Sequence, residues 1–387
     1  MKSIFLLISV CGSLLLLSGC WDRVEVNSLA IVTAAAIDKK GDNQIELSIQ
    51  VFIPKTFSSG GGQEGGSSGG ELVTEVASSK GKNVAEALSK LQSYMPRKIF
   101  WGQCKVFIFG EEVAKDGIQD HLDFLLRHPQ TRERAYAYVG EGKAKRILET
   151  DSGMERYSAE ILLEVSDLGI AMRTTLKDLN EMLIGPSHAA ALPYVKISTA
   201  VKKKRKESYH FPRIFGTAVF QKDQMVGKIT ERETRGILWL RNEVKNYTVT
   251  VHSKELKGDV SLNPVSTDIE LIPRMDGGKW KMNVNIHTEG NVVQNGTNID
   301  FTDPKSVKKV EKVYQEAIKK RIELALQLIQ HDLKTDIVDF SKEFERKYPQ
   351  QWKQVENRWE EVFPEVEVKV NVKTQIRGQG LYSKPGK

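Results

Sequence analysis

The stretch that decides the fold is Leu29–Ile37, LAIVTAAAI, an apolar run without a charged side chain that ends at Asp38. A short run of this kind predicts a buried β-strand. The turn-forming segment Lys39–Asn43 follows it. In the next stretch, Ile45–Ile53, every second residue is apolar, which is the period of a strand with one face in the core. The sequence therefore predicts a sheet that begins at Leu29.

Strand and helix patterns alternate downstream of this pair. Helices are predicted over 83–91, 114–126, 157–183 and 231–240, and strands over 72–76, 98–109, 135–139, 191–201, 246–253, 267–273 and 279–290. A hairpin is predicted around Lys222-Asp223, between strands 214–220 and 224–227. Such a mixture indicates the α+β class, with mixed sheets packed against helices.

A long helix is predicted near 304–333. Asp303 has the chemistry of an N-cap, and Pro304 is suited to the first helical position. Apolar residues follow at helical spacing: Val307, Val310, Tyr314, Ala317, Ile318, Ala325, Leu328 and Ile329. On a long helix, this stripe is more typical of a face packed on a sheet than of a partner-binding surface. A second helix is predicted over 337–346, and a closing strand over 366–372.

The N-terminal segment resembles a bacterial lipoprotein signal. Lys2 precedes an apolar run, Ile4–Leu17, which is shorter than the roughly 20 residues that span a bilayer as a helix. The run ends in Leu17-Ser-Gly-Cys20, which is similar to a lipobox. The resemblance implies that residues 1–19 are a signal peptide and that Cys20 carries S-diacylglycerol and N-acyl groups. An ordinary secretory signal with a chance cysteine, or an uncut anchor helix, are the alternatives.

Composition is ordinary for a soluble globular body. The chain is 40% hydrophobic and 28% charged, with a formal net charge of +7. This mild positive charge suits a protein near an anionic surface and gives little support to nucleic-acid binding. The densest basic run, Lys202–Lys206, indicates either a solvated hairpin or contact with anionic lipid. No nucleic-acid partner is expected, because no aromatic residues are interleaved with this run.

Motifs of catalysis and metal binding are absent from the sequence. Once Cys11 has left with the signal and Cys20 is acylated, Cys104 cannot form an intrachain disulfide, and it is interpreted as a buried thiol. The seven histidines lack metal-ligand spacing. The neighbouring carboxylates Glu111-Glu112 and Glu360-Glu361 are poor acid–base pairs, because adjacent side chains point in different directions. No catalytic residue, metal or cofactor is therefore predicted.

Three domains are expected after the signal peptide. An N-terminal region over 20–200 is predicted to hold two subdomains, and a C-terminal domain is predicted over 211–381. The segment Ser58–Gly70, SSGGGQEGGSSGG, is predicted to be a mobile surface loop between two strands rather than an interdomain linker. It lacks the lysine and the Ser/Thr ending of a phosphate-binding P-loop.

Several stretches together resemble the Ger(x)C spore germination lipoproteins, the C subunits of nutrient germinant receptors. The resemblance runs nearly from end to end and is carried by Gly19–Asp22, Glu25, Leu29–Val32, Ile37-Asp38, Phe100–Gly110, Phe124–Pro129, Arg132, Gly216–Phe220, Met225–Gly227, Glu233–Trp239, Ile337–Phe340, Tyr348-Pro349, Trp352, Trp359 and the strand 366–372. Three departures are Ala36, where the family often has glycine, Ser341-Lys342 after Phe340, where the family often has Phe-Gly after an Asp, and the Gly/Ser segment 58–70, which is longer and plainer than expected.

The resemblance implies a place on the outer face of the spore inner membrane, beside two membrane-embedded subunits, A and B. The family senses nutrients such as amino acids or sugars, and recognition is usually credited to the membrane subunits. We therefore expect a non-enzymatic, lipid-anchored body that docks on A and B and is needed for nutrient-triggered germination. The alternatives are a solute-binding lipoprotein of a transporter, which predicts two similar lobes around a cleft, and a cell-envelope enzyme.

Overall fold

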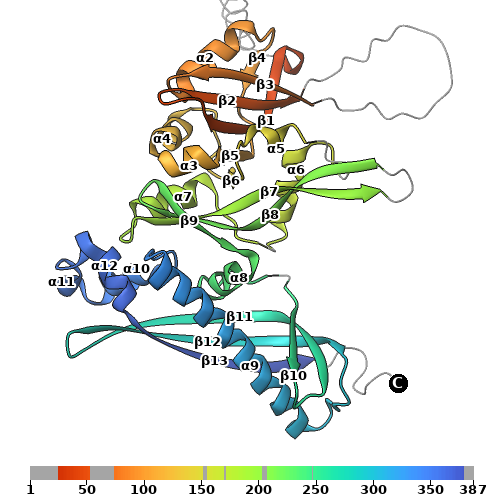
Figure 1. Cartoon of the computed structure of the whole chain (residues 1–387), viewed down its shortest axis with the longest axis vertical. Coiled ribbons are helices and arrows are strands. Elements are labelled where there is room, and N and C mark those ends of the chain that lie inside the picture. Colours follow the sequence, from red (N-terminus) through yellow and green to blue (C-terminus); the bar gives the residue numbers. More distant parts are fainter. Residues whose placement is uncertain are drawn as a thin grey trace, which may run out of the picture.

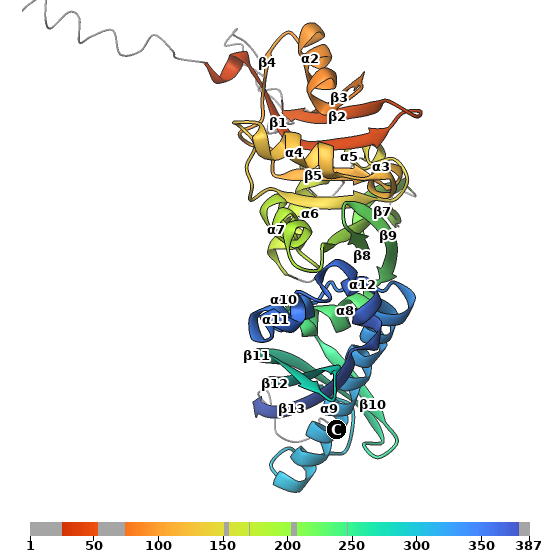
Figure 2. The same ribbon diagram turned by 90° about the vertical axis from the view of Figure 1, so that its left-hand side faces the viewer.

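The computed structural model describes residues 25–52, 74–150, 155–169, 171–202, 207–245 and 247–378. Cys20, the segment Ser58–Gly70 and most of the basic run Lys202–Lys206 lie outside the described residues. The described strands form two sheets, which occupy opposite ends of the long axis of the molecule in both views (Figures 1 and 2).

The first sheet has nine strands in the order β3-β2-β1-β5-β6-β7-β8-β9, with β4 paired to β1 beside this path. The strands are β1 Leu29–Lys39, β2 Ile45–Phe52, β3 Thr74–Gly81, β4 Lys98–Phe100, β5 Val106–Gly110, β6 Tyr136–Gly140, β7 Ala189–Lys202, β8 Glu207–Gln221 and β9 Gln224–Thr230. β1, β5, β6 and β7 are parallel, and the outer strands pair antiparallel.

The apolar run Leu29–Ile37 forms most of the interior strand β1. It pairs with β2 on one side and with β4 and β5 on the other. Val32 and Ala35 face one hydrophobic core, and Ala34 and Ala36 face another. The prediction of a buried strand is confirmed, and its lack of charge follows from burial on both faces of the sheet.

Helices cover both faces of the first sheet. After the 3₁₀ turn η1 Val26–Ser28, they are α2 Val84–Tyr94, α3 Glu111–Asp116, α4 Gln119–Arg127, α5 Lys145–Leu148, α6 Ser158–Asp167 and α7 Leu176–Ile184. The apolar residues of α2, α3, α4 and α7 belong to one core, and those of α5 and α6 belong to the other. This arrangement confirms the α+β class.

Three predicted elements in this region are each split in two. The helix predicted over 114–126 breaks at Gly117, whose φ of 129° lies outside the helical region. The helix predicted over 157–183 ends at Asp167, and Thr175 begins α7 with a capping box. The strand predicted over 98–109 is interrupted by a turn in which the Cys104 N–H donates to the Trp101 carbonyl at 2.8 Å.

The second sheet has four strands in the order β10-β11-β12-β13. Its strands are β10 Val249–Ser253, β11 Gly258–Asp276, β12 Lys279–Asn295 and β13 Glu367–Gly378. The accompanying helices are α8 Glu231–Leu240, α9 Pro304–Gln327, α10 Phe340–Lys347, α11 Pro349–Trp352 and α12 Trp359–Val362, with a π-helical turn η2 Leu328–Asp332 and 3₁₀ turns η3 Glu356–Arg358 and η4 Phe363–Glu365.

The long helix expected near 304–333 is α9 together with its π turn. Asp303 caps it by accepting the Lys305 and Ser306 N–H groups. The predicted stripe lies in the core against the sheet, with Val310, Tyr314, Ile318 and Ala325 buried. Figure 1 shows α9 running across β11, β12 and β13, so the face packed on a sheet is confirmed.

The two sheets share one hydrophobic core at their junction. Ala189 and Ala191 of β7 and Val219 of β8 belong to the same cluster as Ile237 of α8 and the core of the second sheet. The first sheet is continuous from β3 to β9, and position 211 lies inside β8. The two subdomains within 20–200 and the domain 211–381 stay predictions.

Candidate functional site

Of the two cysteines discussed from the sequence, the structure describes Cys104 but not Cys20. Cys20 lies outside the described residues, so its lipidation stays a prediction. Cys104 is a free, fully buried thiol whose Sγ lies 3.6 Å from the Val106 carbonyl oxygen. Burial raises the pKa of this thiol far above its ordinary value, which keeps it protonated and unreactive. The interpretation of Cys104 as a buried thiol is confirmed.

Neither a metal centre nor a membrane-spanning helix is found in the described part of the chain. Among these residues, no three His, Cys, Asp or Glu side chains lie together as a possible ion site. Within the same ranges, no helix combines the length and apolar composition needed to cross a bilayer.

A polar cluster does form where the parallel strands of the first sheet end. Asp38 is near the end of β1, Glu111 directly follows β5, and Glu141 directly follows β6. The carboxyl ends of parallel strands meet at one edge of a sheet, which is where α/β proteins usually place their binding residues. This edge is therefore the first candidate site.

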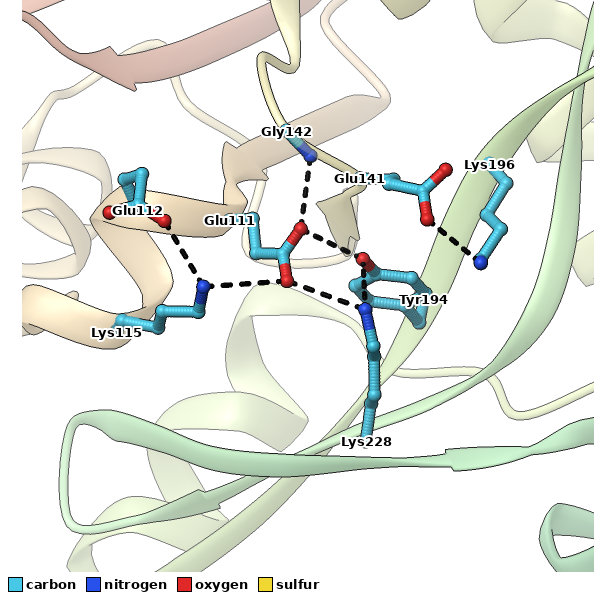
Figure 3. Close-up of polar contacts among 8 residues, drawn as sticks. All are labelled: Glu111, Glu112, Lys115, Glu141, Gly142, Tyr194, Lys196 and Lys228. Carbon is cyan, nitrogen blue, oxygen red and sulfur yellow. Dashed lines mark hydrogen bonds and ion pairs between the residues drawn. The ribbon is translucent and has the colours of Figure 1, made fainter.

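Glu111 is the centre of the cluster (Figure 3). Its Oε2 accepts hydrogen bonds from the Tyr194 hydroxyl at 3.0 Å and from the Gly142 N–H at 3.1 Å. Its Oε1 lies 3.4 Å from Lys228 Nζ and 3.5 Å from Lys115 Nζ. Lys228 Nζ also donates to the Tyr194 hydroxyl at 3.0 Å. One carboxylate thus joins α3, the loop after β6, β7 and β9.

The electrostatics of the cluster fix its charge state. Partial burial acts to raise the pKa of Glu111, but the donors Gly142 and Tyr194 and the two lysine charges outweigh it and lower that pKa. Burial, together with the hydrogen bond to Glu111, raises the pKa of the Tyr194 hydroxyl. The pair is therefore an anion and a neutral phenol at neutral pH, and neither group is poised for proton transfer.

Glu112 is far more exposed than its neighbour Glu111. Its side chain is 66% exposed and lies 3.1 Å from Lys115 Nζ, whereas the Glu111 side chain is 16% exposed. Figure 3 shows both carboxylates in contact with Lys115. The two neighbouring carboxylates therefore differ in burial, and both contact Lys115.

Asp38 serves a structural purpose at the same edge. Its oxygens accept the N–H groups of Ala144 at 2.7 Å and Lys145 at 2.9 Å, at the start of α5. A side chain at Gly110 would place a Cβ 2.2 Å from Asp38 Oδ1, so glycine is required there. Burial raises the pKa of Asp38 despite these hydrogen bonds. In the sequence, Asp38 stands out because it is the charged residue that directly follows the apolar run Leu29–Ile37.

A cavity of about 750 Å³ lies at the junction of the two sheets. Arg241 lines it, with a side chain only 12% exposed. Its Nε donates to Glu243 at 2.8 Å and its Nη1 to the Ile337 carbonyl at 3.0 Å, while Nη1 lies 3.6 Å from Met182 Sδ of α7. The arginine thus connects α7 with the segment before α10, and its donors are engaged in holding the two parts together.

Comparison with known proteins matches both parts of the chain. A family described as "Spore germination protein N-terminal domain" matches residues 22–197. A second, described as "Spore germination B3/GerAC like, C-terminal", matches residues 215–380. This chain belongs to the Ger(x)C family. The resemblance found in the sequence is thereby confirmed.

Relatives of known name agree with this assignment. YfkR of Bacillus subtilis is 29% identical over 329 residues, which covers 84% of this chain and 84% of that protein. Spore germination protein KC of Bacillus subtilis is 27% identical over 343 residues, covering 85% of this chain and 84% of that protein. The crystal structure of the GerBC protein superposes with a TM-score of 0.58 at 16% identity, covering 91% of this chain and all of that one, and so shares the fold.

The Ger(x)C architecture differs from the transporter alternative. A solute-binding lipoprotein predicts two similar lobes, whereas the described residues form one nine-stranded and one four-stranded sheet of different strand order. The Glu111 cluster and Arg241 were not predicted as a site, because their members come from distant parts of the sequence.

Proposed function

We propose that this chain is the lipid-anchored C subunit of a germinant receptor, on the outer face of the spore inner membrane. It docks on membrane-embedded A and B subunits and is needed for nutrient-triggered germination. The observation that carries this proposal is the coincidence of a lipobox-type Cys20 with two consecutive spore germination matches, over 22–197 and 215–380.

The fold supports an anchor that holds the first sheet close to the bilayer. The described body begins at Glu25, only a few residues after Cys20. A chain spans at most about 3.6 Å per residue, so Glu25 lies within about 18 Å of an acylated Cys20. β1, which starts at Leu29, is an interior strand of the first sheet. The tether therefore leads directly into the rigid part of the protein.

We assign the subunit a non-enzymatic, structural role. The Glu111 carboxylate is held by Tyr194, Gly142 and two lysines, and Arg241 joins the two parts at the junction. Gln221 of β8 also donates to Glu360 of α12 at 3.0 Å. These contacts favour a single stiff body, which is suited to stabilising the A and B subunits from outside the membrane.

The test compares Cys20→Ala with the matched control Cys104→Ala. Two acyl chains give stable anchoring, at about 0.8 kcal/mol per buried CH₂, so Cys20→Ala is expected to leave the membrane fraction or accumulate as precursor. Nutrient germination should fall sharply, because the subunit loses its local concentration beside A and B. Cys104→Ala should keep both properties.

Metabolic labelling with a fatty-acid probe reads the attachment directly. Wild type and Cys104→Ala are expected to carry the label, and Cys20→Ala is expected to lack it. Label that persists in Cys20→Ala, or normal nutrient germination by an unlabelled variant, contradicts the proposal.

A further inference from the structure

Helices α8 and α9 cross at Gly236 with almost no space between them. A Cβ at this position would lie 2.5 Å from the Arg321 carbonyl oxygen and 2.6 Å from Ala325 Cβ. This close crossing brings Arg232 and Arg235 of α8 beside Lys320 and Arg321 of α9.

A cavity of about 640 Å³ opens beside the crossing, and we call it the α8–α9 groove. Its lining includes Phe215, Arg232, Arg235, Tyr247, Lys320 and Arg321. The groove lies where the first sheet, through β8, meets the helices of the second sheet, so it belongs to neither the Glu111 cluster nor the Arg241 cavity.

The groove carries more positive than negative charge. Its acidic lining residue is Glu231, whose carboxylate is already paired with Arg235 and, at 3.1 Å, with Arg213. Arg232 and Lys320 are exposed and make no ion pair with any residue that the structure describes. A surplus of cations in a concave site attracts an anionic partner.

Tyr247 gathers two of these cations around one hydroxyl. Arg235 Nη1 donates to the Tyr247 hydroxyl at 3.0 Å, and Arg321 Nη1 donates to the same atom. The two guanidinium carbons lie 4.3 and 5.6 Å from the centre of the tyrosine ring. The tyrosine hydroxyl accepts from both arginines and brings no carboxylate charge to offset them. The arrangement therefore suits a carboxylate.

Apolar surface adjoins the charges. Phe215 is the extra residue of a β-bulge in β8, because Tyr194 pairs with Gly216 and Val195 with Ile214. The residue is 41% exposed, and Lys196 Nζ lies 4.3 Å from the centre of its ring. A neighbouring apolar pocket of about 270 Å³, lined by residues such as Ile161 and Leu238, shares Glu231 and Arg235 with the groove.

We propose that the α8–α9 groove docks an acidic segment of a membrane-embedded receptor subunit. Carboxylates of that segment bind Arg232, Lys320 and Arg321, and an apolar side chain packs against Phe215 and the adjoining pocket. The combination of surplus cations and apolar surface in one concave groove fits a polypeptide better than a flat bilayer. This inference rests on the proposed function, since it names the surface through which docking occurs.

Site-specific photo-cross-linking tests the occupant. Benzoylphenylalanine replaces Phe215 in the full-length chain in spores, and the matched control replaces Val265, another exposed bulge residue, which is 50% exposed on β11. Irradiation is expected to join the residue at 215, but not the one at 265, to an A or B subunit. A cross-link from 215 to phospholipid alone, or to no protein, overturns the inference.

Charge reversal tests the recognition. The double variant Arg232→Glu/Lys320→Glu is expected to lower the recovery of A and B with the tagged chain by tenfold or more, because rim and groove charges oppose an acidic partner after reversal. The control Lys308→Glu/Lys309→Glu makes the same charge change at exposed positions of α9, the helix that also carries Lys320, and is expected to have no effect. Both variants should keep the wild-type melting temperature and membrane attachment.

The outcomes separate the two proposals. If the wild-type chain fails to co-purify with A and B, the proposed function is wrong, and so is the proposal that the groove docks one of them. If the wild type co-purifies and both double variants behave alike, only the groove is wrong. Loss confined to Arg232→Glu/Lys320→Glu, together with the cross-link from position 215, supports the groove.

Discussion

Trp359 Nε1 donates a hydrogen bond of 3.0 Å to Asp336 Oδ2, and both residues are buried. The same carboxylate accepts three backbone N–H groups, from Val338 at 3.3 Å, Phe340 at 3.2 Å and Ser341 at 2.7 Å. One aspartate therefore holds the start of α10 against α12.

This relationship explains why the helix predicted over 337–346 is present but starts later than predicted. The helix begins at Phe340. The N–H groups of Phe340 and Ser341 donate to the Asp336 carboxylate, whereas in a helix starting at Ile337 they would donate to backbone carbonyls of the preceding turn. Asp339 then adopts a φ of 60°, which ends any helical path from Ile337.

Asp336→Asn is expected to destabilise the protein by roughly 1–3 kcal/mol at neutral pH. The amide nitrogen of asparagine faces a donor that the carboxylate accepted, and a buried donor without an acceptor carries the full desolvation cost. Chemical denaturation measures the free energy of unfolding. Asp332→Asn, at an exposed position nearby, should change it little. Equal stability of the two variants would contradict the proposed role of the carboxylate.

The cost of Asp336→Asn should also depend on pH. Burial raises the pKa of Asp336 above its ordinary value, although the N–H donors act in the opposite sense. A raised folded-state pKa means that the folded state binds the proton more tightly than the unfolded state, so this group loses stability as the pH rises from about 3.9. The difference between wild type and Asp336→Asn should therefore be larger at pH 4 than at pH 8.

Glu111→Gln is expected to show the reverse pH dependence. The lowered pKa of Glu111 means that its stabilisation is present above the ordinary carboxyl pKa and is lost as the pH falls through the folded-state value. Unfolding measured from pH 7 to pH 3 should thus bring wild type and Glu111→Gln together at the acid end. Glu112→Gln, on the exposed side of the same helix, should resemble wild type throughout.

Much of the fold follows from local patterns, and the candidate sites do not. Each of three features is visible in a single local stretch of sequence: the uncharged run at Leu29–Ile37, the apolar stripe on α9 and the turn at Lys222. Tyr194 meets Glu111 across a sequence separation of 83, and Lys228 meets Tyr194 across 34. The order of the strands in the first sheet, parallel from β1 through β5 and β6 to β7 and antiparallel from β7 to β9, brings those side chains together, and no local pattern encodes that order.

Gly236→Ala is expected to destabilise the α8–α9 crossing by roughly 1–3 kcal/mol, the usual cost of overpacking a tight contact. The added methyl group would meet backbone at Arg321, which cannot move as a flexible side chain does. Chemical denaturation should show this loss, while Arg232→Ala, at an exposed position of the same helix, should not. A stable Gly236→Ala variant would mean that the helices can separate.

The fragment 211–381 is predicted to unfold cooperatively, since it holds the four-stranded sheet, α9 and most of their shared core. It should melt below the full-length chain, because the fragment begins inside β8 and loses Ala189 and Ala191 from that core. Calorimetry compares the two directly. A fragment without a cooperative transition would show that the C-terminal part depends on the first sheet for folding.

Shortening Ser58–Gly70 to four residues is expected to change the free energy of unfolding by less than about 1 kcal/mol. The segment lies outside the described residues, but the strands on either side of it are paired, with Phe52 opposite Thr74 at the ends of β2 and β3. Because those ends are neighbours, a short connection can join them, and each doubling of loop length costs only about 0.6 kcal/mol in closure entropy.

Denaturation of the shortened and full-length chains provides the measurement. The control is Gly41→Ala, at a φ of 72° in the turn before β2, which should be destabilised by local strain. A larger loss in the shortened chain than in Gly41→Ala would show that Ser58–Gly70 packs against the body of the protein.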